Sequence, residues 1–179
     1  TIRRLDVETL DSYELGARGE VAGVRYDIAL YPMSKKNFFF RDSDGLNVPN
    51  GATRHFGIEA ALDGEFGAFA GGAFKWNANA SFSDQTYAFD RNVAAAAEDI
   101  ASGTKIDTAP DWLADAGFGW ENGRFSIFAT TEYVGEYFAN AANTALYEGH
   151  LIAHLRGAWR FNDTFETFMI VRNLTDERY

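Results

Sequence analysis

Aromatic and basic side chains gather in the parts of this 179-residue chain that lie between alternating apolar segments. Aromatic faces pack against flat groups, and guanidinium groups pair with carboxylates or other negative charge. Because binding residues concentrate on loops held by a rigid scaffold, the candidate ligand-binding residues are Phe38, Phe39, Phe40, Arg41, Tyr87, Arg91, Tyr137 and Tyr147. Packing between neighbouring loops explains residues 38–40 equally well, and a position at a membrane interface explains Tyr137.

Histidine and acidic residues do not occur at the spacing of a metal site. His150 and His154 share one face of a predicted strand, but four residues of extended chain separate them by roughly 13 Å. His55 stands alone in the sequence. The stretch DSDG at residues 42–45 has its glycine too early for a calcium loop and lacks the final glutamate, so it predicts a turn. We therefore expect no metal ligands.

Composition excludes several other classes of function. The net charge of −10 argues against a nucleic-acid partner. The absence of cysteine excludes disulfides and cysteine-based metal sites. Gly117, Gly119 and Gly123 span a strand and a hairpin instead of opening a helix, so they do not form a dinucleotide site. No nucleophile and base stand at a readable spacing, and we expect no catalytic residues and no cofactor.

Alternation of apolar and polar residues with period two dominates the chain and predicts strands. In residues 148–161, one face carries Leu151, Leu155 and Trp159, and the other carries His154 and Arg156. The same pattern predicts seven further strands, at residues 12–22, 24–31, 56–63, 74–83, 111–120, 124–138 and 165–174. Several of these exceed the five or six residues that are usual in globular proteins.

Short and long connections alternate along the chain. Turn-forming residues predict tight connections around Gly23 and at residues 63–67, 121–123 and 161–163. Three other connections are long, namely residues 32–53, 84–109 and 138–146, and within them only residues 93–101 predict a short helix. Short turns at one end and long loops at the other are typical of an outer-membrane β-barrel. A soluble β-sandwich or a soluble lipocalin-like barrel remains an alternative, because a sheet in a soluble protein also buries one face.

In a membrane barrel the two faces must be strictly sorted, since a basic residue facing the middle of the lipid costs about 2–4 kcal/mol. We expect the apolar parity on the convex, lipid-facing side, represented by Leu151, Leu155, Trp159, Tyr133, Ile127, Phe74, Trp76 and Ile28. We expect the polar parity on the concave side, represented by Arg156, His154, Glu132, Glu59, Asp27 and Arg18.

The last residues, FMIVRNLTDERY, carry the most specific pattern. Apolar alternation followed by Val171, Asn173, Leu174, Thr175, Asp176 and Tyr179 resembles a late barrel strand of TonB-dependent outer-membrane receptors. Further similarities follow in the order of that family: SYELGARG with Glu14 and Gly16, ATRHFGIE with Gly57 and Glu59, APDW at residues 109–112, and a hairpin with a Tyr/Asn-rich loop at residues 133–161. The resemblance covers nearly the whole chain.

This resemblance implies an all-β fold, a transmembrane antiparallel up-and-down β-barrel segment of about eight long strands that stays open. Residues 1–179 would be one partial domain from the C-terminal portion of the barrel, without the plug domain and the final strand. The implied function is TonB-energised uptake of iron-siderophore complexes or another scarce nutrient, in the bacterial outer membrane and without enzymatic activity. The implied partners are outer-membrane lipid, the plug and through it TonB, and a siderophore-like molecule.

Three alternatives remain at this point. The first is a complete small eight-stranded outer-membrane barrel with a structural or adhesive role, and the second is a soluble β-sheet binding module. The third, an outer-membrane hydrolase, would need a triad assembled across strands.

Overall fold

The computed structural model describes residues 6–41, 45 and 47–179, without the side chains of residues 40, 41, 47 and 48. Most of the predicted turn at residues 42–45 therefore lies outside the described residues. The described elements are β1 (Thr9–Ser12), β2 (Leu15–Val21), β3 (Val24–Arg41), β4 (Asn47–Phe69), β5 (Gly72–Tyr87), the 3₁₀ turn η1 (Ala96–Glu98), β6 (Trp112–Glu121), β7 (Phe125–Val134), β8 (Tyr137–Phe138), β9 (Leu146–Tyr147), β10 (His150–Arg160) and β11 (Glu166–Val171).

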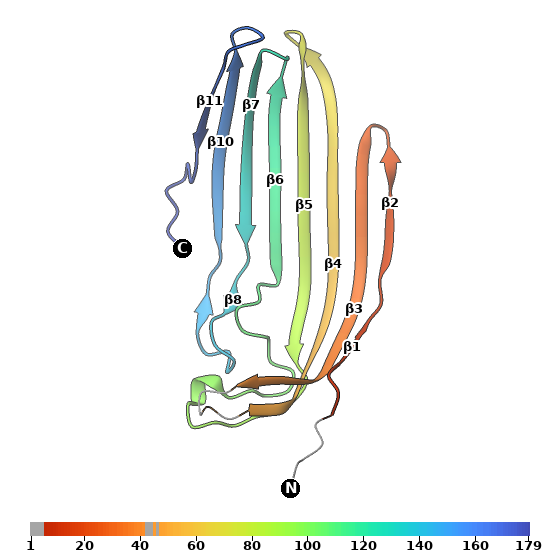
Figure 1. The fold of residues 1–179 in the computed structure, drawn as a ribbon, viewed down its shortest axis with the longest axis vertical. Helices are drawn as coiled ribbons and strands as arrows, with labels where there is room; N and C mark the ends of the chain where they lie inside the picture. The colour runs from red at the N-terminus through yellow and green to blue at the C-terminus, as the bar shows by residue number, and fades with distance from the viewer. Residues whose placement is uncertain (1–5, 42–44, 46) are drawn as a thin grey trace.

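One antiparallel sheet of nine strands contains all of these strands except β8 and β9 (Figure 1). The order is β1-β3-β4-β5-β6-β7-β10-β11, and β2 pairs with β3 beside β1. Strands β1 and β2 both pair with β3, one after the other along its length. Counted together as one interrupted strand, they make the sheet eight strands wide. Within the described residues no pairing joins β1 or β2 to β11, so the sheet is open at both edges, as predicted.

The connections sort to the two ends of the sheet as predicted. The turns β2–β3, β4–β5, β6–β7 and β10–β11 lie at one end, and the long connections β5–β6 and β7–β10 lie at the other, together with the end of the β3–β4 hairpin (Figure 1). We call the second end the loop end. Among the described residues, no helix has the length and the apolar character needed to cross a membrane.

The predicted loop at residues 32–53 is wrong, because β3 and β4 pair almost to the end of their hairpin. Their ladder runs from Val24 opposite Gly64 to Arg41 opposite Asn47, with register shifts after Lys36. Pro32 and the polar residues after it interrupt the apolar alternation. The sequence pattern therefore does not predict this part of β3. A proline can stay in a ladder where no hydrogen bond from its nitrogen is required.

Three smaller predictions are also wrong. Residues 63–67 continue β4 past a bulge at Gly67, and the turn itself is made by Ala70 and Gly71, both with positive φ, as a two-residue hairpin turn requires. Residues 93–101 contain only η1, because the bridge between Arg91 and Ile100 closes the segment as a loop. Strand β7 stops at Val134, and β8 starts separately at Tyr137.

The register confirms the sorting of residues into two faces. One row of cross-strand neighbours is apolar and runs through Leu151, Tyr133, Ala114, Ala80, Ala60, Ile28 and Ala17. The adjacent row on the other face runs through Ile152, Glu132, Asp115, Asn79, Ala61, Asp27 and Arg18. Leu155, Trp159, Ile127, Phe74 and Trp76 share the first face, and His154, Arg156 and Glu59 share the second. We call these the apolar face and the polar face.

The apolar face is exposed instead of forming a core. Of the described hydrophobic residues, only Ile100 and Ile152 are buried. Phe66, Phe118 and Trp159 are 52%, 49% and 53% exposed, although Phe66 and Phe118 stack with Phe74 into a cluster. A sheet in water would bury such a surface, because apolar burial drives folding. The exposed face therefore favours a lipid environment over the soluble alternatives.

Candidate functional site

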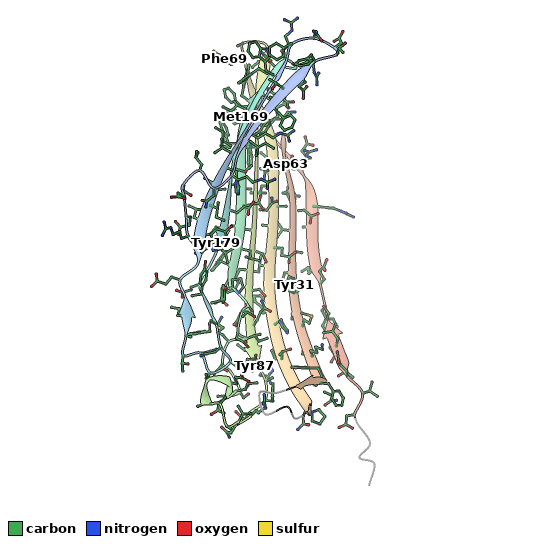
Figure 2. All side chains as sticks on the ribbon, turned by 60° about the vertical axis from the view of Figure 1, so that its left-hand side comes forward. Tyr31, Asp63, Phe69, Tyr87, Met169 and Tyr179 are labelled. Atoms are coloured by element: carbon green, nitrogen blue, oxygen red, sulfur yellow. The ribbon has the colours of Figure 1, made fainter. Side chains whose placement is uncertain are left out.

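Two of the predicted ligand-binding residues meet at the loop end beside β3 and β5. The Phe38 ring packs edge-on against Phe89 at 6.2 Å between centroids, and Tyr87 packs against the same ring at 5.8 Å. The Lys35 ammonium lies 5.2 Å from the Phe38 centroid, within range of a cation–π contact. We call Phe38, Tyr87 and Phe89 the β3–β5 cluster. Figure 2 shows Tyr87 at the loop end, far from Phe69 and Met169 near the short turns.

A second pair meets on the small β8–β9 hairpin. The Tyr137 and Tyr147 rings lie 4.8 Å apart, and the Tyr147 hydroxyl is 2.6 Å from Nδ1 of His150. His150 in turn stacks on Tyr179 at 4.3 Å. We call Tyr137, Tyr147, His150 and Tyr179 the β8–β9 cluster. It combines flat apolar surface with hydroxyl and imidazole groups that can make directional hydrogen bonds.

The remaining predicted residues do not join these clusters as a single site. Phe39 is 46% exposed and has no ring contact among the described aromatic pairs. Arg91 exchanges two backbone hydrogen bonds of 2.8 Å with Ile100, which fixes the connection at that point. The side chains of Phe40 and Arg41 lie outside the described residues, although their backbone belongs to β3. The eight candidates are thus divided between two clusters and several separate positions.

Sequence reasoning missed Phe89 and His150 as members of these clusters. Phe89 follows Tyr87 by two residues, so a shared face was the available signal. The sequence pattern places His150 on the polar face of its strand and gives no sign of its aromatic partners. The described part of the chain contains no group of three or more His, Asp or Glu placed to hold a metal ion.

The polar face carries two broad hollows between the loop end and the short turns. One, of about 540 Å³, is lined by the carboxylates of Asp27, Glu59, Asp115 and Glu132. The other, of about 740 Å³, includes Glu132 together with His154, Arg156, Arg172 and Tyr179. Nε2 of His154 lies 3.4 Å from the Glu132 carboxylate. These hollows leave charged groups accessible along the polar face, where a second protein segment or a passing solute can meet them.

Glycines on the polar face make room for aromatic rings from the neighbouring strand. The Tyr31 ring lies across Gly57, so a Cβ at Gly57 would overlap its ring atoms, and Phe38 lies across Gly51 in the same way. Gly57 and Glu59 belong to the pattern noted above in ATRHFGIE, and Glu59 lines the acidic hollow. Of the other motif residues, Gly16 lies within β2, and Glu14 lies exposed between β1 and β2.

Replacing Gly57 by valine is expected to destabilise the sheet by about 1–3 kcal/mol, because overpacking displaces the Tyr31 ring. Gly16→Ala is the matched control, since its Cβ would meet only the Ile28 carbonyl at 3.4 Å. Urea unfolding of the purified protein measures both changes. Adding Tyr31→Ala to Gly57→Val should recover part of the loss, and a Gly57→Val midpoint equal to the parent would contradict the packing.

The NLTDERY motif forms a closed turn that ends β11. Asn173 adopts a left-handed φ of 50°, and its side chain donates to the Glu177 carbonyl and accepts from the Glu177 N–H, both at 2.9 Å. Its own N–H donates to Nδ1 of His154 at 3.1 Å, and Leu174 N–H donates to the Ala153 carbonyl at 2.7 Å. The turn therefore folds back onto β10 and places Tyr179 against His150.

Comparisons with known proteins agree on one architecture. The sequence model of the family described as "TonB dependent receptor-like, beta-barrel" matches residues 3–174. A comparison with curated proteins finds no sequence match.

Solved structures match over almost the whole chain. The ferric citrate transporter FecA in its unliganded form is 16% identical with a TM-score of 0.77, covering 95% of this chain and 27% of that chain. The siderophore receptor PiuA from Acinetobacter baumannii is 15% identical with a TM-score of 0.76, covering 95% and 25%. The ferric-catecholate import receptor Fiu from K12 E. coli is 18% identical with a TM-score of 0.73, covering 98% and 24%. The chain spans about a quarter of the length of these structures.

Proposed function

Because the chain belongs to the TonB-dependent receptor β-barrel family, we propose that it forms part of the barrel wall of an outer-membrane receptor. The receptor imports iron-siderophore complexes or another scarce nutrient, with energy delivered by TonB. The observation that carries this proposal is the family match over residues 3–174. The family consists of transport receptors, and we expect no catalytic step from this chain.

The open sheet and the order of the sequence motifs support a proposed position within the receptor. We place the chain in the C-terminal portion of the barrel, with its edges β2 and β11 continuing into further strands. The apolar face meets outer-membrane lipid, and the polar face meets the plug domain, through which TonB acts. The accessible charges of Asp27, Glu59 and Asp115 support this assignment, since a lumen-facing surface is polar in such barrels.

The loop end is the proposed entry side for cargo. The β3–β5 cluster and the β8–β9 cluster offer aromatic faces, and flat metal chelates suit such surfaces. The similar structures carry names that refer to ferric citrate, a siderophore and ferric catecholate, which supports a ferric chelate as the cargo class. Phe39, Arg41 and Arg91 are proposed as additional contacts at the same end.

Uptake of a radiolabelled ferric chelate by cells that express the full-length receptor tests the proposal. We expect uptake from ferric citrate or from a ferric catecholate, and we expect deletion of tonB to abolish it while surface binding persists. Uptake that continues without TonB, or absence of binding to any ferric chelate at normal membrane abundance, would reject the proposal in this form.

Changing Tyr87 and Tyr147 together to alanine is expected to weaken binding of the imported chelate by roughly tenfold or more, about 1.4 kcal/mol. The two residues contribute from different clusters, so the single variants should each lose part of the affinity. Tyr133→Ala, on the apolar face, is the control and should bind like the parent. Equilibrium binding to purified receptor measures the effect, and an unchanged Kd would move the binding site away from these clusters.

A further inference from the structure

The β5–β6 connection returns along the end of β5 before it reaches β6. Tyr87 N–H donates to the Thr104 carbonyl at 2.9 Å, and Ile106 N–H donates to the Gln85 carbonyl at 3.0 Å. Thr86 and Lys105 face each other between these bonds as an isolated antiparallel bridge. In such a pair the bonds to β5 come from the flanking residues, so the N–H and carbonyl of Lys105 point away from β5.

The side chain of Asn143, from the β8–β9 connection, forms hydrogen bonds with both the N–H and the carbonyl of Lys105. Lys105 N–H donates to Oδ1 of Asn143 at 2.8 Å, and Nδ2 of Asn143 donates to the Lys105 carbonyl at 2.9 Å. The amide thus occupies the place that the backbone of another strand would take. Asn143 has a φ of 56°, a left-handed conformation that asparagine tolerates better than most residues.

Two further backbone bonds join the same two connections, and two ion pairs of Lys105 hold the β5–β6 connection in place. Thr108 N–H donates to the Phe138 carbonyl at 2.7 Å, and Ala142 N–H donates to the Ala97 carbonyl at 3.2 Å. The Lys105 ammonium binds Asp84 in β5 at 3.0 Å and Asp111, the residue before β6, at 2.7 Å, which ties it to both ends of the connection. Burial acts to lower the pKa of Lys105, but its hydrogen bonds to Asp111 and Asp84 outweigh burial and raise that pKa.

These bonds form a continuous path between the two aromatic clusters. Tyr87 of the β3–β5 cluster donates from its hydroxyl to Asp107, two residues after Lys105. On the other side, Phe138 follows Tyr137 of the β8–β9 cluster. We propose that Asn143 is a positioning residue that holds the two clusters at a fixed separation, so that the cargo meets a preformed pair of aromatic surfaces. This inference rests on the proposed function, because it concerns binding of the same cargo.

Asn143→Gly in the full-length receptor is the sharpest variant, because glycine keeps the positive φ and removes only the amide. Asn122→Gly is the matched control: it removes side-chain bonds to Arg124 and Phe125 in a turn at the opposite end of the sheet. Spin labels on cysteines introduced at Ala95 and Ala141, in a chain without natural cysteine, report the separation of the two connections. Binding and uptake are measured with ferric citrate and with a ferric catecholate.

We expect a narrow distance distribution in the parent and in Asn122→Gly, and a broad one in Asn143→Gly. Asn143→Gly should raise the Kd for the chelate by about tenfold while the maximal uptake rate and membrane abundance stay unchanged, since preorganisation lowers the cost of binding. A narrow distribution in Asn143→Gly, or a broad one with unchanged Kd, would overturn the inference. If the parent binds neither chelate, the proposed cargo fails, and the label distances alone then decide whether Asn143 holds the connections together.

Discussion

Replacing Leu155 by arginine is expected to reduce assembled receptor in the outer membrane far more than replacing its neighbour Arg156 by leucine. The two residues are adjacent in β10 but belong to opposite faces of the sheet. Leu155 pairs with Ala129 and Val171 on the apolar face, and Arg156 pairs with Phe128 and Ile170 on the polar face. The comparison therefore exchanges the same two residue types and changes only the face that receives them.

The expected asymmetry follows from the surroundings of each face. An arginine that faces lipid near the middle of the bilayer costs about 2–4 kcal/mol, and this falls to about 0–1 kcal/mol near the interface. Leucine on the polar face loses only the solvation of an accessible charge, because Arg156 borders a wide hollow instead of a sealed core. Leu155 lies in the middle of β10, so the larger figure applies if the apolar face meets lipid.

The measurement is the amount of folded receptor in isolated outer membranes, with the full-length receptor expressed from its own promoter. Leu155→Met controls for the loss of leucine itself, since this swap conserves volume and polarity. Trp159→Arg, on the same face but one residue from the end of β10, should show a smaller defect than Leu155→Arg. Equal outer-membrane levels of Leu155→Arg and Arg156→Leu would show that the faces are assigned wrongly.

The faces could be predicted from the sequence because alternation is a local property. Once Ile28, Tyr133 and Leu151 are each assigned to the apolar side of their own strands, any antiparallel register that keeps one face apolar places them on the same face, and pairing between strands then sets the row. The structure aligns them in one row. Strand β11 is the partial exception, because Phe168 and Ile170 share the polar face with Arg156.

The lengths of β3 and β4 could not be predicted in the same way. Beyond Pro32 the strand contains Lys35, Lys36 and Asn37, and the register shifts there, so the alternation is interrupted on both sides of the ladder. What extends the hairpin is pairing between strands, which is a tertiary property. The aromatic residues that were assigned to a loop are instead held by a strand, and this gives Phe38 a fixed position across Gly51.

The candidate site shows the same limit more strongly. Aromatic type alone indicated Tyr87, Tyr137 and Tyr147, but their partners come from register and from loop contacts. His150 meets Tyr147 and Tyr179 only because the C-terminal turn folds back over β10. Asn143 had no local signal beyond lying in a Tyr/Asn-rich loop, since its two bonds join residues 38 positions apart in the chain.

The turn that ends β11 leads to the second large expected effect. Asn173→Ala should destabilise the turn by about 2–5 kcal/mol, because it removes two hydrogen bonds worth about 0.5–1.5 kcal/mol each and leaves alanine at a positive φ that costs about 1–2 kcal/mol. Asn173→Gly removes the bonds but tolerates φ, so it should lose about half as much. Asn173→Asp keeps the acceptor for Glu177 N–H and loses the donor to the Glu177 carbonyl, which places it between parent and glycine.

Hydrogen exchange of the Glu177 and Leu174 amides in the full-length receptor measures this local stability directly, because each amide is bonded inside the turn or to β10. Exchange in Asn173→Ala should accelerate on the order of thirtyfold or more, which corresponds to 2 kcal/mol or more. Thr175→Ala is the control, since its hydroxyl lies 3.5 Å from Asn173 Oδ1 and contributes little.

His154→Phe should accelerate exchange at Asn173 by removing the acceptor of its N–H while leaving the Glu177 amide protected. If the three Asn173 variants and the parent exchanged alike, the motif would stop β11 by some means other than the hydrogen bonds of the Asn173 side chain.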